Sequence, residues 1–149
     1  MNSKLINRII FVLSIFGILI AAYVLYSYVT DSPIVCVNQG CDLVRKSPYA
    51  NVFGLPVPLY GFLGYIIIMI LSFLYTTSVA WKNKILLIRF VISAGGFLFV
   101  SYLTFLEAYV IKGWCMWCVF SAIIMTTVFI LSGINYWTVN KFKNDNSGS

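Results

Sequence analysis

The chain has 149 residues, of which 61% are hydrophobic and 9% are charged, and its formal net charge at pH 7 is +6. Soluble domains carry about a quarter charged residues, so this composition excludes a soluble globular protein and indicates a single integral membrane domain. The sequence holds no histidine, which excludes histidine general bases, histidine metal ligands and the Cys-x-x-Cys-His attachment of c-type haem.

Four apolar stretches are each long enough to cross a bilayer as a helix, which takes about 20 residues. We expect membrane spans over residues of about 9–29, 58–79, 85–111 and 115–137, and therefore an all-α membrane domain over 1–138 built as a four-helix bundle. The first stretch is too long for a signal peptide and lacks a clear cleavage site, so we interpret it as an uncleaved anchor.

The first two spans are joined by a polar loop over residues 30–57 that holds Cys36 and Cys41. Within this loop the segment DLVRKS, at 42–47, has two apolar residues beside charged ones, which predicts a short helix lying on the membrane surface. The prolines of the next segment exclude a continuous helix and indicate that the second span begins near Pro58.

Small and charged residues interrupt the apolar pattern of the second and third spans. Gly61 and Gly64 lie on one helix face, where small residues allow close helix packing. Arg89 and Glu107 lie near opposite ends of the third span, where we expect their long side chains to reach the membrane surface. The polar tail over 139–149 predicts a disordered cytoplasmic segment.

The basic residues flank the apolar stretches, so we attribute the positive charge to membrane topology and not to nucleic-acid binding. Seven of them fall on one side of the membrane and three on the other: Lys4, Arg8, Lys82, Lys84, Arg89, Lys141 and Lys143 against Arg45, Lys46 and Lys112. The positive-inside rule then predicts a multi-pass protein of the plasma membrane with both termini in the cytoplasm. All four cysteines are expected on the extracytoplasmic face, where disulfides persist.

The segment WCMWC carries the strongest chemical signal, because Cys115 and Cys118 lie three residues apart at the start of the fourth span. The partial positive charge of a helix N-terminus stabilises a thiolate and lowers its pKa. A disulfide that closes so short a loop removes little chain entropy. The pair is therefore better suited to redox chemistry than to stabilising the fold.

The second pair, Cys36 and Cys41, is a weaker signal by itself, since a loop disulfide is often structural. Two dithiols on one membrane face can pass electrons to each other by thiol–disulfide exchange. Two alternatives stay open, which are a zinc site built from all four cysteines and a scaffold held by two structural disulfides.

A lipid-soluble electron acceptor can reach a Cys-x-x-Cys pair at the lipid boundary, and the sequence has no haem or flavin motif. We therefore expect a membrane quinone, either menaquinone or ubiquinone, as the acceptor, and no metal. Aromatic residues near the two pairs are candidates for the walls of a flat quinone pocket: Phe53, Trp114 and Trp117, with Tyr49 and Phe120.

Several of these features, in this order, resemble the bacterial and archaeal branch of the vitamin K epoxide reductase (VKOR) family. They are the loop cysteine pair, Ser47 six residues after it, the segment SPYANVFGLPVPLYGFLGY, and Cys-x-x-Cys at the start of the last span. The resemblance covers about residues 9–137. It implies a four-helix bundle around a quinone and an enzyme that reoxidises a thioredoxin-like partner, which makes disulfides in exported proteins.

The resemblance also implies roles for individual residues. Cys36 and Cys41 match the shuttle pair and Cys115 and Cys118 the active pair beside the quinone, with the Ser47 hydroxyl close to them. In the quinone site, the counterpart of the family's asparagine is assigned to Asn51, and Ser121 is included as a candidate. We expect Cys36 to meet the partner and Cys41 to meet Cys115, because Cys41 is nearer in sequence to Ser47.

The sequence departs from the family in two places. Ser121 and Ala122 stand where the animal enzymes have a tyrosine one turn beyond the second active cysteine, so epoxide reduction is not implied. Many bacterial members carry a fused thioredoxin-like domain, and this chain ends too soon for one, so we expect a separate DsbA-type partner on the outer face. The alternative family, DsbB, has the same activity but has its Cys-x-x-Cys pair first in the chain.

Overall fold

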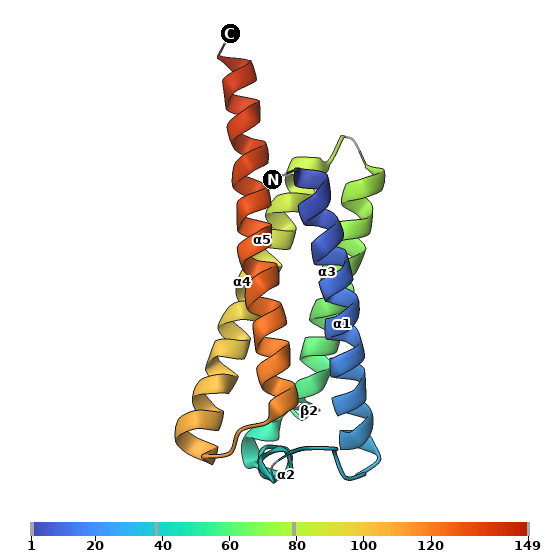
Figure 1. Cartoon of the computed structure of the whole chain (residues 1–149), viewed down its shortest axis with the longest axis vertical. Coiled ribbons are helices and arrows are strands. Elements are labelled where there is room, and N and C mark those ends of the chain that lie inside the picture. The colour runs from blue at the N-terminus through green and yellow to red at the C-terminus, as the bar shows by residue number, and fades with distance from the viewer. Residues whose placement is uncertain (1, 38, 79, 149) are drawn as a thin grey trace.

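The computed structural model of the protein describes residues 2–37, 39–78 and 80–148. Four long helices run along one axis (Figure 1): α1 (Ser3–Val29), α3 (Val57–Thr77), α4 (Lys82–Phe105) and α5 (Met116–Ser147). Each is long and apolar enough to cross a membrane, α4 together with the turn after it. The predicted all-α membrane bundle is confirmed. The predicted boundary residues 1, 79 and 149 lie outside the described residues.

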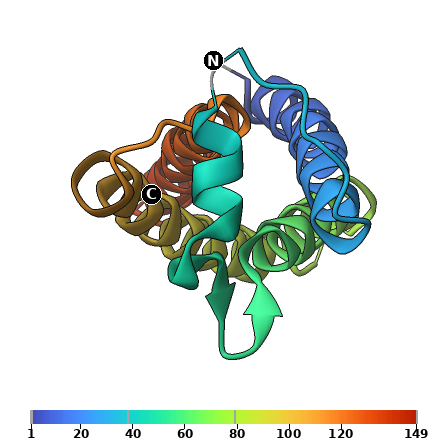
Figure 2. The ribbon, with the colours of Figure 1, turned by 90° about the horizontal axis from the view of Figure 1, so that it is seen from below.

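The four helices form a ring in which α1 and α4 each pack against both α3 and α5 (Figure 2). The core between them is apolar and comes from three of the helices: Ile6, Ile10, Tyr65, Ile68, Met125 and Val128. Helices in lipid associate through close van der Waals packing, since lipid is as apolar as the core. Gly17 provides such an approach, because a Cβ atom there would lie 2.5 Å from the Tyr65 ring.

Between α1 and α3 the chain forms a cap over one end of the bundle. Helix α2 (Gly40–Lys46) lies across that end (Figure 2), which agrees with the short surface helix predicted from the sequence. A 3₁₀ turn (Pro48–Ala50) and a hairpin of β1 (Asn51–Val52) and β2 (Leu55–Pro56) come next. This hairpin was not predicted from the sequence. Its turn residues Phe53 and Gly54 have φ angles of 53° and 79°, and two-residue hairpin turns of type I′ require positive φ at both positions.

The sequence predicted one continuous helix for the third membrane-crossing segment, but this segment is not a single regular helix. After α4 the chain forms a π-helical turn (Leu106–Ile111), and Lys112, in the left-handed conformation with φ of 52°, ends it. The amide of Gly113 then donates a hydrogen bond to the Glu107 carbonyl at 3.2 Å. A π-turn holds one residue more than an α-turn. The π-turn of this protein contains Glu107, whose carboxyl is buried.

Two expectations for the charged and small residues of these spans were wrong. Arg89 and Glu107 do not extend to the membrane surface, since they are only 0% and 3% exposed and lie inside the bundle. Gly61 and Gly64 do not serve close packing, because a Cβ atom at either would meet nothing within 4 Å. The Arg89 side chain stays inside the bundle because it donates a hydrogen bond to Asn7 there, so it does not need to reach the surface for a polar partner.

The predicted disordered tail is also corrected. Helix α5 continues without a break to Ser147 and projects beyond the other helices (Figure 1). No proline or glycine occurs between Gly133 and Gly148, so nothing in the sequence ends the helix earlier. Its last residues, 141–148, are exposed.

Candidate functional site

The cysteines belong to the capped end of the bundle, since Cys41 is in α2 and Cys115 and Cys118 are at the start of α5. Figure 1 shows α2 at the end opposite both termini. Cys36 and Cys41 form a disulfide with their Cα atoms 6.4 Å apart, whereas Cys115 and Cys118 are free thiols. Cys41, in the first turn of α2, is 2% exposed, and Cys115 is 3% exposed. Cys36 and Cys118 are half-buried.

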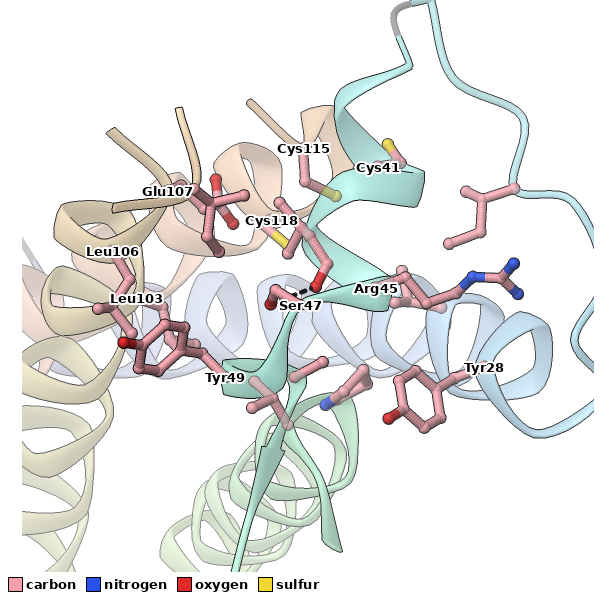
Figure 3. Close-up of a pocket in the computed structure, with 17 residues that line it drawn as sticks. Tyr28, Cys41, Arg45, Ser47, Tyr49, Leu103, Leu106, Glu107, Cys115 and Cys118 are labelled. Atoms are coloured by element: carbon pink, nitrogen blue, oxygen red, sulfur yellow. Dashed lines mark hydrogen bonds between the residues drawn. The ribbon is translucent and has the colours of Figure 1, made fainter. Parts of the chain in front are cut away.

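Close backbone packing brings the two pairs together. A Cβ atom on Gly40 would overlap the Trp114 carbonyl, and one on Gly113 would lie 3.4 Å from the Leu43 side chain. The first turn of α2 therefore rests directly on the segment before α5. Figure 3 shows Cys115 and Cys118 near each other, with Glu107 on one side of them and α2, which carries Cys41, on the other.

Cys115 is the N-cap residue of α5 and lies just outside the four membrane-crossing helices. A hydrogen bond from the Cys118 thiol lowers the pKa of the Cys115 thiol below its ordinary value, against the opposing effect of burial. This direction agrees with a thiolate at a helix N-terminus. Of the two free thiols, Cys115 is thus the one prepared to carry negative charge.

The cysteines open onto a cavity that we call the thiol cavity. Its walls are mainly apolar side chains, and the chemically reactive residues among those that line it are Cys41, Ser47, Glu107, Cys115 and Cys118 (Figure 3). A second, inner cavity extends toward the middle of the bundle, and Glu107 and Cys118 line both. Each holds about 580 Å³ of unfilled space including its open mouth. Apolar walls with few polar groups are typical of a site for a flat, lipid-soluble ligand.

Three residues predicted to bind quinone lie on these walls. Ser47 lines the thiol cavity, and its hydroxyl donates a hydrogen bond to the Val44 carbonyl at 2.8 Å. Trp117 and Ser121 line the inner cavity. The Trp117 indole donates to the Val35 carbonyl at 3.0 Å.

The other three predicted residues lie elsewhere. Asn51 is at the rim, where its side-chain oxygen accepts a hydrogen bond at 2.8 Å from Tyr28, a residue of the thiol cavity. Phe53, at the hairpin turn, is 97% exposed and lines neither cavity. Trp114 lies on a shallow groove on another side of α5. Of the two further aromatic candidates, Tyr49 lines the thiol cavity and Phe120 lines neither.

Glu107 belongs to the site, although the sequence analysis did not include it. Its carboxyl lies within hydrogen-bonding reach of the Cys118 thiol, and the π-turn directs it inward. A carboxyl inside an apolar span is by itself a signal of function. That signal was present in the sequence, but the position near the helix end led us to expect a surface location.

Arg45 is the second residue missed, and its role is to hold α2 in place. Its Nη1 donates to the carbonyls of Ser27 and Ser32, each at 3.2 Å. It also pairs with Asp31 at 3.1 Å and with Asp42 at 3.5 Å. The end of α1 and the helix that carries Cys41 are thereby joined through one guanidinium.

No group of three or more cysteine, aspartate or glutamate side chains that could hold a metal ion occurs in the described part of the chain. The reactive groups at the site are the Cys36–Cys41 disulfide, the thiols of Cys115 and Cys118, and the Glu107 carboxyl, beside an apolar cavity.

The sequence model of the vitamin K epoxide reductase family matches residues 8–133. This range takes in all four cysteines, the cap and both cavities. Since the match covers most of the chain, the protein belongs to the vitamin K epoxide reductase family, and with it to the membrane thiol–disulfide oxidoreductases that use a quinone as electron acceptor.

Proposed function

We propose that this protein oxidises the dithiol of a separate thioredoxin-like protein and passes the two electrons through both of its cysteine pairs to a membrane quinone. One observation carries this proposal: Cys41, Cys115 and Cys118 line a single apolar cavity, while Cys36, the disulfide partner of Cys41, is more exposed. Electrons can therefore enter at the sulfur of Cys36 and leave from Cys115 and Cys118 inside the cavity.

In the first step a partner thiolate attacks the Cys36 sulfur, and the Cys36–Cys41 bond breaks with Cys41 leaving as a thiolate. The partner's second thiol then attacks the mixed disulfide and releases Cys36. The partner gains a disulfide and the loop pair becomes a dithiol. The difference in exposure supports Cys36 as the residue attacked, since Cys41 is only 2% exposed.

In the second step the Cys41 thiolate attacks Cys115 in the Cys115–Cys118 disulfide and releases Cys118. Cys36 then attacks Cys41, which restores the loop disulfide and releases Cys115 as a thiolate, while the Cys118 thiolate takes up the proton of Cys36. The packing of Gly40 on the Trp114 carbonyl supports this exchange, because it brings Cys41 to the segment that carries Cys115.

In the last step Cys115 and Cys118 form a disulfide and give up two electrons. A quinone bound in the cavities accepts these electrons with two protons. Cys118 lines both cavities, which supports it as the thiol that faces the acceptor. Glu107 accepts the proton from Cys118 and delivers it toward the acceptor, and Ser47 stabilises negative charge there once its hydroxyl turns away from the Val44 carbonyl.

The test is quinone reduction by the purified protein in detergent. A reduced DsbA-type protein supplies electrons, and short-chain ubiquinone and menaquinone are compared by their absorbance. We expect turnover with the wild type and none with Cys118→Ala. Ser101→Ala is the matched control, because it removes one atom at an exposed position of α4 and should leave turnover unchanged.

A second variant tests the route. Cys36→Ala should stop oxidation of the protein substrate, whereas dithiothreitol, which is small enough to reduce the inner pair directly, should still drive quinone reduction. If the folded wild type reduces neither quinone with either donor, the proposal is wrong and a scaffold with structural disulfides becomes the better interpretation.

A further inference from the structure

A polar layer lies at the end of the bundle opposite the cysteines, and Arg89 is at its centre. The side chain is 0% exposed. Arg89 lies about 10 Å along the helix from Lys82, the first residue of α4, because an α-helix rises about 1.5 Å per residue. Its Nη1 donates to Asn7 Oδ1 at 2.6 Å and contacts Ser72 Oγ at 3.5 Å, and the guanidinium lies 5.7 Å from the centre of the Tyr75 ring. All these partners are neutral.

The charge of Arg89 has no counter-charge within the described residues, where the ion pairs are those of Arg45. Buried charges are normally paired, because removing an ion from water is costly. The neutral groups around Nη1 satisfy hydrogen bonds without balancing this charge. An anion is therefore the missing partner that the electrostatics require.

The unpaired atoms of the layer are all hydrogen-bond donors. Nε and Nη2 of Arg89 are buried without a partner among the described residues, as are Ser132 Oγ and Asn135 Nδ2. Nε and Nη2 carry the two parallel N–H bonds of the guanidinium edge that binds anions in a bidentate manner. A water molecule could accept some of these bonds but would leave the charge uncompensated.

Contacts between the helices link Asn135 to Arg89, and Ser132 lies one helical turn before Asn135 on α5. Ser3 Oγ lies 2.6 Å from the Tyr75 hydroxyl and donates to Asn135 Oδ1 at 2.5 Å. Tyr75 in turn lies against Arg89. Side chains from α1, α3, α4 and α5 thus meet in a single layer that encloses the guanidinium.

We infer that this layer binds one small monovalent inorganic anion, of which chloride is the probe, on the Nε–Nη2 edge of Arg89 with Ser132 and Asn135 as further donors. The full burial of Arg89 excludes a lipid headgroup, which is too large to enter the closed bundle. A monovalent anion balances the single positive charge. The inference is independent of the proposed redox function, because the layer and the cysteines lie at opposite ends of the bundle (Figure 1).

The test is the thermal midpoint of the purified protein, measured by tryptophan fluorescence, as chloride or bromide replaces gluconate at constant ionic strength. We expect a saturable rise of the midpoint in the wild type and no rise in Arg89→Met, which removes the charge while keeping an apolar side chain that the core can accept. Ser132→Ala should keep the rise but shift it to higher chloride. Lys84→Met, which removes an exposed cation from the same helix, should respond as the wild type does.

Crystals grown with bromide provide a direct measurement, since an anomalous peak is expected within hydrogen-bonding distance of Arg89 Nε and Nη2. An equal response in the wild type and Arg89→Met would mean that chloride acts elsewhere on the surface and would overturn the inference. Equal midpoints in gluconate and chloride, with no bromide peak at Arg89, would overturn it as well and would assign the unpaired donors to water.

Discussion

The carboxyl of Glu107 and the thiol of Cys118 lie within hydrogen-bonding reach of each other, although they belong to two different membrane-crossing segments. Both also face the two cavities in which we propose that the quinone binds. A dithiol that reduces a quinone must release protons as well as electrons, and inside lipid these protons need a carrier. Glu107 is the acidic side chain at the cavities in the described structure.

Replacing Glu107 with glutamine tests this role. Glutamine keeps the shape and the hydrogen-bonding groups but cannot carry a proton, and a positioned acid or base contributes about 10²–10⁴-fold to a rate. We expect the kcat for quinone reduction to fall by about 10²-fold or more, while reduction of the Cys36–Cys41 disulfide by the partner continues. Stopped-flow absorbance measures the reduction of the quinone, and thiol trapping measures the reduction of the Cys36–Cys41 disulfide. An unchanged kcat would remove Glu107 from the mechanism.

The pH dependence of Cys115 alkylation reports the state of the inner pair. Because the hydrogen bond from Cys118 lowers the pKa of Cys115, the thiolate persists to lower pH than that of an ordinary cysteine, whose pKa is about 8.5. The midpoint of the alkylation rate should therefore lie at lower pH in the wild type than in Cys118→Ala. Mass spectrometry of the peptide that carries Cys115 measures it. A midpoint that does not move between the two proteins would contradict the hydrogen bond.

Gly40→Ala tests the contact that brings the cysteine pairs together. The added Cβ atom would overlap the Trp114 carbonyl, which is backbone and cannot turn aside, so α2 must shift. In a Cys36→Ala and Cys118→Ala background, where Cys41 and Cys115 remain, we expect the disulfide between them to form more slowly. Gly95→Ala is the matched control, since its Cβ atom would meet nothing within 4 Å. Equal rates in both variants would show that the contact does not control the exchange.

Arg45→Met should destabilise the cap. Its side chain is 11% exposed, and its guanidinium donates to the Ser27 and Ser32 carbonyls. Hydrogen bonds to charged groups are worth about 1.5–3 kcal/mol. We expect a loss of about 2 kcal/mol and faster proteolysis within residues 30–57. Asp31→Asn should cost less than about 0.5 kcal/mol, because Asp31 is 91% exposed and exposed ion pairs contribute little. A loss in Asp31→Asn as large as that in Arg45→Met would show that the ion pair, and not the carbonyl contacts, holds α2.

The sequence predicted the bundle well because span length and hydropathy are local properties. The four spans, the surface helix and the position of Cys115 at a helix start are all indicated by patterns shorter than about 25 residues. Ser47 at the thiol cavity was expected from the family resemblance, and Trp117 at the inner cavity from its residue type beside the cysteines. These features depend little on how the helices pack.

The features that sequence reasoning missed depend on packing between distant segments. The burial of Arg89 requires Asn7 and Ser72 from two other helices, and no local pattern announces such partners. Phe53 was a reasonable candidate by residue type, but the hairpin turn directs it outward. The π-turn that buries Glu107 differs from an α-helix by a single extra residue, which hydropathy does not register.

That extra residue has a genetic consequence. Deleting the codon of Leu106 would remove the extra residue of the π-turn ahead of Glu107, and each residue removed turns the part of a helix that follows by about 100° relative to the part before it. Glu107 would then point away from Cys118 while all four cysteines and every membrane span remained. A frame-preserving deletion of three nucleotides should thus lower quinone reduction as Glu107→Gln does, in a protein that sequence comparison would still place in the same family.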